Sequence, residues 1–232
     1  HPSPKFAGHG LSIVPPKSSL WWNARGERFG PMPLVSGYDT RFLVEQICSQ
    51  PEKYSWQIMN RKIALRELAI SGAEFNDSIR NKSWVGFLKN ILFGNKNLYH
   101  SLTTDSKDVV VADSVESLVE GMNRIACNSL VNTSNLKSAI QGYDSMIDRG
   151  YKFFDDEQLR RIAHLRQYRG DRVRTLKFQK IVDSRAMPLI AIREFILSRK
   201  SLGGIQTDLD CRVLSLPENG KQSYIEGLYA VG

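Results

Sequence analysis

Cysteine and histidine are the side chains that most often hold metal ions, form disulfides or act as nucleophiles, and this chain has few of them. The three cysteines, Cys48, Cys127 and Cys211, lie far apart and form no CxxC pair. The four histidines are equally scattered. This spacing argues against a zinc site, a disulfide framework or a compact catalytic triad. We therefore expect no bound metal, and a reducing compartment such as the cytoplasm.

Glycine patterns that cradle phosphate groups are missing from the 232 residues, which contain neither a Walker loop nor a GxGxxG turn. The most specific text comes at the end of the sequence. There KSLGGIQTDLDCRVL, Lys200 to Leu214, is followed by a polar turn and by IEGLYAVG. On its own the first of these stretches is a strand that starts after a glycine pair.

The net charge of +8 raises the question of a nucleic-acid partner, and the densest basic stretch is LRRIAHLRQYRGDRVRTLKFQK, residues 159–180. No helix-turn-helix, zinc-finger or ribonucleoprotein signature surrounds it. We interpret it as a solvated helix face, or as an edge against an anionic cofactor or partner domain, and expect no nucleic acid. No apolar run approaches the roughly 18 residues that suggest a membrane span, so we expect none.

Apolar periodicity predicts a helical middle. A short helix capped by Asp39 or Thr40 should run through Ile47, and a longer one should span Tyr54 to Ser71. SWVGFLKNILF has apolar residues at helical spacing, and Gly94 is placed to end that helix. Two further helices follow a strand at DVVVA. We expect Asp113 with Glu116 to cap the first, and Thr133 or Ser134 to cap the second, which should stop at Gly150. The helical block should end by Gly170.

Strand signals lie toward both ends. SSLWWNARGERF predicts a hairpin that turns at Asn23 to Gly26, in which one of Trp21 and Trp22 is core and the other is covered by a neighbouring domain. MPLIAIREFIL and the two final stretches also read as strands. The predicted fold class is α+β, mostly helical, with residues 1–182 as one region and 183–232 as another. We expect the terminal strands to be poorly paired.

The tail resembles the superfamily of FAD-dependent dehydrogenases that includes fumarate reductase flavoproteins and 3-ketosteroid-Δ1-dehydrogenases. The matching residues are Gly203-Gly204, Thr207-Asp208, Arg212-Val213-Leu214 and Gly227-Leu228-Tyr229-Ala230-Val231-Gly232. The helical middle is similar to the substrate-cap domain of those enzymes, and the front is similar to a branch known simply as FAD-binding dehydrogenases.

The resemblance implies that residues 1–182 form a substrate cap and that residues 183–232 return to an FAD domain whose Rossmann-type core is absent. It implies that Gly203, Gly204 and Gly232 lie near FAD, because glycine lets the main chain approach a flat ring without a Cβ. Fumarate reductases have a His-Thr pair before the Gly-Gly. Lys200 and Ser201 stand there, beside Arg199, so these three are the candidate catalytic residues.

The implied activity is hydrogen transfer across a C–C bond next to a carbonyl or carboxylate of a small molecule, with FAD as the cofactor. We expect this chain to be a fragment of such an enzyme that by itself neither binds FAD tightly nor catalyses the reaction. The sequence leaves the oligomeric state open. It also leaves open an alternative, a separate interaction module that binds an anionic partner through its basic helix.

Overall fold

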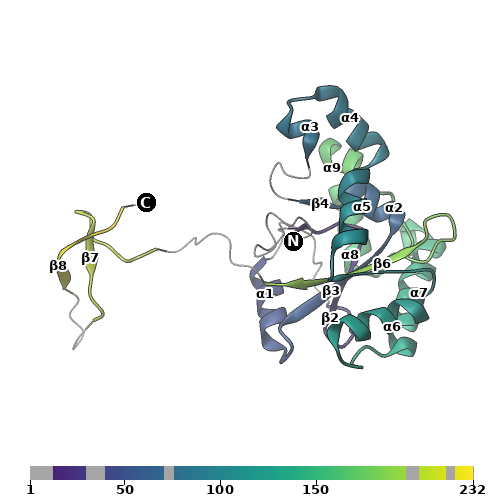
Figure 1. Cartoon of the computed structure of the whole chain (residues 1–232), viewed down its shortest axis with the longest axis horizontal. Coiled ribbons are helices and arrows are strands. Elements are labelled where there is room, and N and C mark those ends of the chain that lie inside the picture. The colour runs from purple at the N-terminus through teal and green to yellow at the C-terminus, as the bar shows by residue number, and fades with distance from the viewer. Residues whose placement is uncertain (1–12, 30–39, 71–75, 197–203, 218–222, 232) are drawn as a thin grey trace. The chain divides into compact units, whose positions relative to one another are not determined.

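The computed structural model describes residues 13–29, 40–70, 76–196, 204–217 and 223–231. The chain divides into two compact units, His1–Ile196 and Leu197–Gly232 (Figure 1). The sequence analysis placed the boundary after residue 182 instead. The difference arises because the strand at 189–195 pairs on both of its edges with strands of the first unit.

The first unit is built on a four-stranded antiparallel sheet with the strand order β2-β3-β6-β5. Two short strands, β1 and β4, form a separate antiparallel pair. The six strands are β1 (Ile13–Val14), β2 (Leu20–Asn23), β3 (Tyr54–Asn60), β4 (Ala69–Ile70), β5 (Val109–Ala112) and β6 (Leu189–Phe195). The expectation of poorly paired terminal strands is wrong for β2 and β6, since both pair along their length with β3.

Strand β3 is the largest correction to the sequence analysis, which predicted a helix from Tyr54 to Ser71. Tyr54 to Ile58 alternate apolar and polar side chains, as a strand does, and the polar ones are covered as well, so that all seven residues of β3 are buried. The chain becomes helical only at α2, after Asn60. The Asn60 side chain accepts a hydrogen bond from the backbone N–H of Ile63 and caps that helix.

The helices of the described ranges lie around this sheet. They are α1 (Thr40–Ser49), α2 (Arg61–Glu67), α3 (Asp77–Arg80), α4 (Trp84–Phe93), α5 (Lys96–Asp105), α6 (Val115–Ala126), α7 (Thr133–Arg149), α8 (Glu157–Leu165) and α9 (Arg169–Arg174). Helices α6 and α7 lie together on one side of the sheet, whereas α3 and α4 stand away from it at one end of the unit (Figure 1). Within these ranges, no helix combines the length and apolar character that crossing a membrane requires.

Some helix ends lie where the sequence analysis predicted them, and others lie at neighbouring residues. Gly94 and Gly150 end α4 and α7, as predicted. The capping box of α6 is Ser114 with Ser117, one residue after the predicted Asp113 and Glu116. Helix α7 is capped by Asn132 rather than by Thr133 or Ser134. Gly170 lies inside α9 and does not interrupt it.

The predicted hairpin at the front is present, and it is fixed by its turn. The Gly26 N–H donates to the Asn23 carbonyl oxygen at 3.1 Å, and Gly26 adopts a φ of +74°, which favours glycine. The prediction for the two indoles is wrong, because both are covered within the unit: Trp21 is 8% exposed and Trp22 is 1% exposed. Register places them on opposite faces of the sheet.

The second unit contains a two-stranded antiparallel sheet of β7 (Arg212–Leu214) and β8 (Tyr224–Tyr229). The sequence predicts these two strands; the turn that it predicts between them, at Pro217 to Gly220, lies largely outside the described residues. The Arg212 guanidinium donates to Asp208 Oδ2 at 2.7 Å and lies 4.6 Å from the centre of the Tyr224 ring. Every residue of β8 is exposed, so within the described part of this unit both faces of β8 are uncovered.

Candidate functional site

The two faces of the four-stranded sheet differ in polarity. Trp22 and Trp56 are paired across β2 and β3 and lie on the face that packs against α6 and α7, within the main apolar core. The opposite face carries Ser55 and Gln57 on β3 and Glu194 on β6, since the register pairs Ser55 with Glu194 and Gln57 with Ile192. Polar side chains are therefore concentrated on one face of an otherwise apolar sheet.

Gln57 and Glu194, hereafter the polar pair, are buried without complete hydrogen bonding. Gln57 is 0% exposed and its Nε2 meets no acceptor, while Glu194 is half-buried and its Oε1 meets no donor, in the part of the chain that the structure describes. Their neighbour Ser55 is satisfied, because its Oγ accepts from Trp21 Nε1 at 3.0 Å. Unsatisfied buried polar atoms are uncommon in native proteins and often mark a functional site.

Burial raises the pKa of Glu194 to about 8, because the charged carboxylate is poorly solvated there. At neutral pH the side chain is therefore mostly a neutral carboxylic acid, which can donate one hydrogen bond. The Gln57 amide also offers free donors. The polar pair consequently presents two donors and no charge.

The register brings these donors within reach of one acceptor. Gln57 and Glu194 are diagonal neighbours on adjacent antiparallel strands, positions whose Cα atoms are about 7–8 Å apart. The side chains that continue the same face, Met59, Ile190 and Ile192, are all buried and apolar. A carbonyl oxygen on an apolar molecule could accept from both members of the polar pair, in surroundings where hydrogen bonds are strong.

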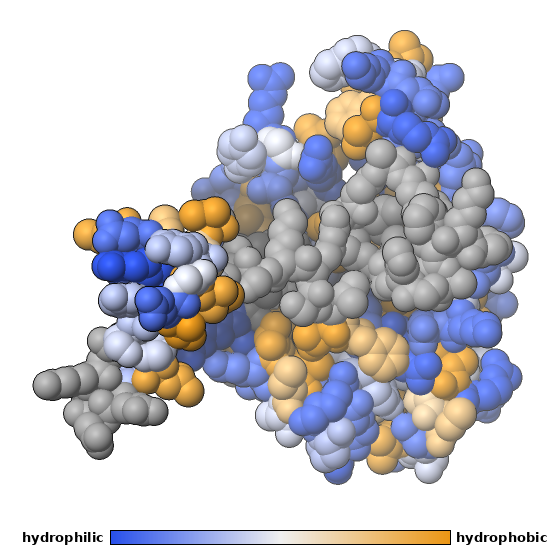
Figure 2. Space-filling model, turned by 60° about the vertical axis from the view of Figure 1, so that its left-hand side comes forward, coloured by the Kyte–Doolittle hydropathy of each residue, from blue (hydrophilic) through white to orange (hydrophobic). Residues whose placement is uncertain are grey.

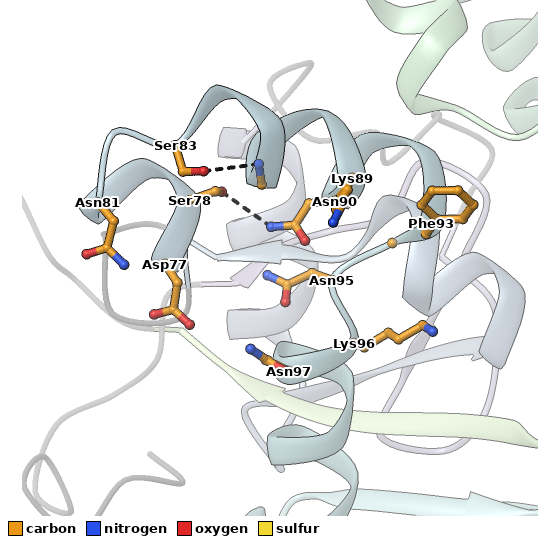
Figure 3. A pocket seen from close by; sticks show the side chains of 12 residues that line it. Asp77, Ser78, Asn81, Ser83, Lys89, Asn90, Phe93, Asn95, Lys96 and Asn97 are labelled. Carbon is orange, nitrogen blue, oxygen red and sulfur yellow. Dashed lines mark hydrogen bonds between the residues drawn. The ribbon is translucent and has the colours of Figure 1, made fainter.

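A second feature is an open hollow of about 460 Å³ between α3, α4 and the start of α5 (Figure 3). Its lining is polar, and several of the side chains are engaged. Asn90 Nδ2 donates to Ser78 Oγ at 3.3 Å, and Ser83 Oγ accepts from the Gly86 N–H at 3.2 Å. The Asn95 side chain accepts from the Leu98 N–H and caps α5. These contacts explain the hollow as a junction between helices, and its polar walls do not suit an apolar substrate.

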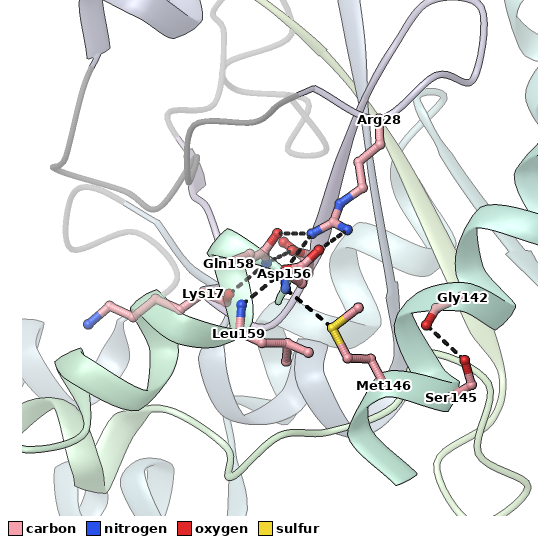
Figure 4. Close-up of polar contacts among 9 residues, drawn as sticks. Lys17, Arg28, Gly142, Ser145, Met146, Asp156, Gln158 and Leu159 are labelled. Carbon is pink, nitrogen blue, oxygen red and sulfur yellow. Dashed lines mark hydrogen bonds and ion pairs between the residues drawn. The ribbon is translucent and has the colours of Figure 1, made fainter. Parts of the chain in front are cut away.

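A third cluster of charged residues is structural (Figure 4). The Arg28 guanidinium donates to both carboxylate oxygens of Asp156, at 2.5 and 3.2 Å, and to Gln158 Oε1 at 3.1 Å. Asp156 also caps α8 by accepting from the Leu159 N–H. Gln158 Nε2 donates to the Lys17 and Ser19 carbonyl oxygens, at 3.0 and 2.5 Å. The cluster ties the front hairpin to α8, and its hydrogen bonds are used in doing so.

Most of the site residues implied by the resemblance lie outside the described residues: Arg199, Lys200, Ser201, Gly203 and Gly232. Gly204 is described and exposed, and a Cβ at its position would meet no atom within 4 Å. The polar pair was missed by the sequence analysis. Gln57 fell in the segment predicted as helix, and Glu194 was part of the predicted strand MPLIAIREFIL and was assigned no role. The available signal was a carboxylate inside the apolar run LIAIREFI.

The N-termini of α4 to α8 do not provide the diphosphate part of an FAD site. Such a site needs a glycine turn that leads into a free helix N-terminus. Helices α4 to α8 begin instead at a Ser, Asn or Asp whose side chain already accepts a backbone N–H of the first turn. Among the described residues, no three His, Cys, Asp or Glu side chains lie close enough together to hold a metal ion.

Comparison with known proteins gives two consistent results. The family model described as FAD binding domain matches residues 3–232. A protein of Mycolicibacterium smegmatis named KsdD-like steroid dehydrogenase is 36% identical over 230 residues, which cover 99% of this chain and 41% of that protein. A protein of Mycobacterium tuberculosis with the same description is 35% identical over 231 residues, 99% of this chain and 40% of that protein. The chain spans about two fifths of the length of these relatives.

Proposed function

Because the chain belongs to the FAD-binding domain family, whose cofactor is FAD, we propose that it is part of a flavin-dependent oxidoreductase. Within that enzyme, residues 13–196 act as the substrate cap and the β7–β8 hairpin belongs to the FAD domain. The separate antiparallel sheet of the first unit and its surrounding helices support a cap role. The capped N-termini of α4 to α8 support the assignment of the main cofactor contacts to other parts of the protein.

The proposed substrate is an apolar ketone, and the observation that carries this proposal is the polar pair. Among the described residues, Gln57 Nε2 and Glu194 Oε1 are buried atoms without hydrogen-bond partners, and Met59, Ile190 and Ile192 continue the same sheet face. Together they would hold one carbonyl oxygen and draw electron density toward it, which activates the adjacent C–C bond toward loss or gain of hydrogen. The name steroid dehydrogenase that the two relatives carry supports a steroid ketone.

The alternative of a module that binds anions through its basic helix has less support. Arg166 donates to the carbonyl oxygens of Thr175 and Arg172, and Arg160 pairs with Glu157 within the same helix. Several cations of the basic stretch are thus occupied within the chain.

A matched ligand pair tests the role of the polar pair: 5α-androstan-3-one, and 5α-androstane, which has the same ring system without the oxygen. With the full-length, FAD-loaded enzyme of which this chain is proposed to be part, Glu194→Leu and Gln57→Leu should each weaken binding of the ketone about tenfold, the usual effect of one lost hydrogen bond. Binding of the hydrocarbon should not change. Glu194→Gln keeps a donor and should keep most of the ketone affinity.

Gln179→Leu is the matched control, because Gln179 is also buried but its Nε2 donates to Asp183 at 3.0 Å, away from the proposed site. Near-ultraviolet circular dichroism verifies that each variant is folded. An unchanged preference for the ketone in both leucine variants would remove the polar pair from substrate binding.

A further inference from the structure

Helix α4 exposes apolar side chains. Its inner side is mixed: Phe87 and Ile91 are half-buried there, Asn90 donates to Ser78 of α3, and Gly86 approaches the Ser78 Cβ. An apolar stripe faces outward. Four side chains at successive helical positions form this stripe, hereafter the α4 stripe: Trp84 is 79% exposed, Val85 66%, Leu88 55% and Leu92 59%. No residue of α4 is buried.

The neighbouring surface adds to the stripe. Phe93, at the end of α4, is 66% exposed, and Ile79 of α3 is 56% exposed. Apolar and hydrophilic residues lie side by side at the end of the unit where α3 and α4 stand (Figure 2). A contiguous exposed apolar surface with a polar rim usually marks a site of contact with another body.

The charge around the α4 stripe is mainly positive, with Asp77 of α3 as an acidic neighbour. From Ser78 to Thr104 the sequence contains no Asp or Glu, and it contains Arg80, Lys82, Lys89 and Lys96. The ion pair between Arg80 and Asp77 engages one of these cations. A second copy of the chain would bring equal charges together around its own stripe, which disfavours self-association through this surface. An anionic surface with an apolar interior complements both the stripe and the lysines.

We propose that the α4 stripe docks on a lipid bilayer that contains anionic headgroups. The helix lies in the plane of the interface, with Trp84, Leu88 and Leu92 at the boundary between headgroups and acyl chains and with Lys89 and Lys96 at the phosphates. With ten residues, α4 is far too short to span the roughly 30 Å hydrocarbon core. The contact is therefore peripheral and reversible, and it does not depend on the proposed enzymatic function.

Tryptophan fluorescence provides a direct test, because all four tryptophans of the chain lie in the described ranges. Trp21, Trp22 and Trp56 are at most 8% exposed, and Trp84 is the exposed one. Vesicles of phosphatidylcholine with about 30% of the anionic lipid phosphatidylglycerol should shift the tryptophan emission to shorter wavelength. Brominated acyl chains should quench it, and quenching should be lost in Trp84→Phe.

Sedimentation with the same vesicles measures affinity. Leu88→Ser with Leu92→Ser, and separately Lys89→Glu with Lys96→Glu, should each weaken binding at least tenfold. Leu209→Ser is the matched control, since Leu209 is a fully exposed leucine of the other unit. Added salt should weaken binding of the unmodified chain.

Three outcomes would overturn the proposal. Equal binding to vesicles of pure phosphatidylcholine, or none to either kind, would remove the anionic bilayer as the partner. A blue shift that grows with protein concentration without vesicles would assign the stripe to a second copy. Protection of Trp84 from iodide at every dilution without vesicles would mean that another part of the same chain covers it.

Discussion

Glu194 is a carboxyl group whose protonation couples directly to folding. In the unfolded chain its pKa should lie near the ordinary value of 4.5, whereas burial raises its pKa to about 8 in the folded protein. Between these two values the folded state binds more protons than the unfolded state. The contribution of Glu194 to stability is therefore fully present below about pH 4.5 and is lost as the pH rises through 8.

This linkage predicts that Glu194→Gln flattens the pH dependence of stability. Glu67 and Asp144 also have pKa values raised by burial, so the unmodified chain should lose stability with rising pH for more than one reason. The difference between variant and parent isolates Glu194. Urea unfolding at pH 5, 6, 7 and 8 should show the free energy of unfolding falling more steeply in the parent, by up to about 1.4 kcal/mol per pH unit. Parallel profiles would mean that Glu194 titrates as a solvated carboxylate.

Cap residues show why some single-residue features could be predicted from the sequence and others could not. Gly94 was predicted correctly because a glycine directly after an apolar helical pattern commonly ends the helix. The cap of α6 was placed one residue too early, because Asp113 and Ser114 are both good caps and only the path of the chain decides between them. Gln57 and Glu194 could not be found in this way, since their meeting depends on the register of two strands separated by most of the unit.

At the scale of elements, local periodicity predicted α6 and α7 well and β3 poorly. The apolar face expected for α6 is Val115, Leu118, Val119, Met122 and Ile125; the first four are buried and Ile125 is half-buried. Strand β3 is buried on both faces, and helix α2 follows it directly. The sequence analysis therefore extended the helical pattern of α2 back over the strand. Helix α4 was recognised as a helix, but its apolar stripe faces outward, which periodicity alone does not reveal.

Two glycines within helices provide an element-scale test of packing. A Cβ on Gly121 of α6 would lie 2.3 Å from Val110 Cγ1 on β5, whereas a Cβ on Gly142 of α7 would meet nothing within 4 Å. Gly121→Ala should therefore destabilise the protein by about 1–3 kcal/mol through overpacking between α6 and the sheet. Gly142→Ala should stabilise it by about 0.5–1 kcal/mol, because alanine is the better helix former.

Thermal unfolding of the two variants under identical conditions measures this difference. The pair serves as its own control, since both substitutions add one methyl group to an α-helix. If both variants were stabilised alike, α6 would not pack as closely against β5 as the structure describes.

At the scale of the whole molecule, membership of the FAD-binding domain family was correctly anticipated from the tail motifs, because those motifs are dense and specific. The site residues named from the resemblance stay a prediction. The residues named from the resemblance lie largely outside the described ranges, while the buried polar pair belongs to the centre of a sheet whose middle strand was predicted as helix. Sequence motifs thus identified the family, and three-dimensional pairing was needed to find the donors on the sheet.

The distribution of cofactor contacts leads to a prediction for the chain as a whole. Tight FAD binding in such folds rests mainly on the diphosphate, which a glycine turn and a free helix N-terminus hold. Helices α4 to α8 have capped N-termini, and the described residues of the hairpin unit, which include Gly204, contain no helix. Without diphosphate contacts, the ordering of a long flexible cofactor is poorly compensated. The purified 232-residue chain should be colourless, and it should leave FAD fluorescence unchanged at micromolar concentrations. FMN, which lacks the second phosphate and the adenosine, is the control: equal and negligible responses to both are expected, whereas stoichiometric FAD with weak FMN binding would place a diphosphate site within these residues.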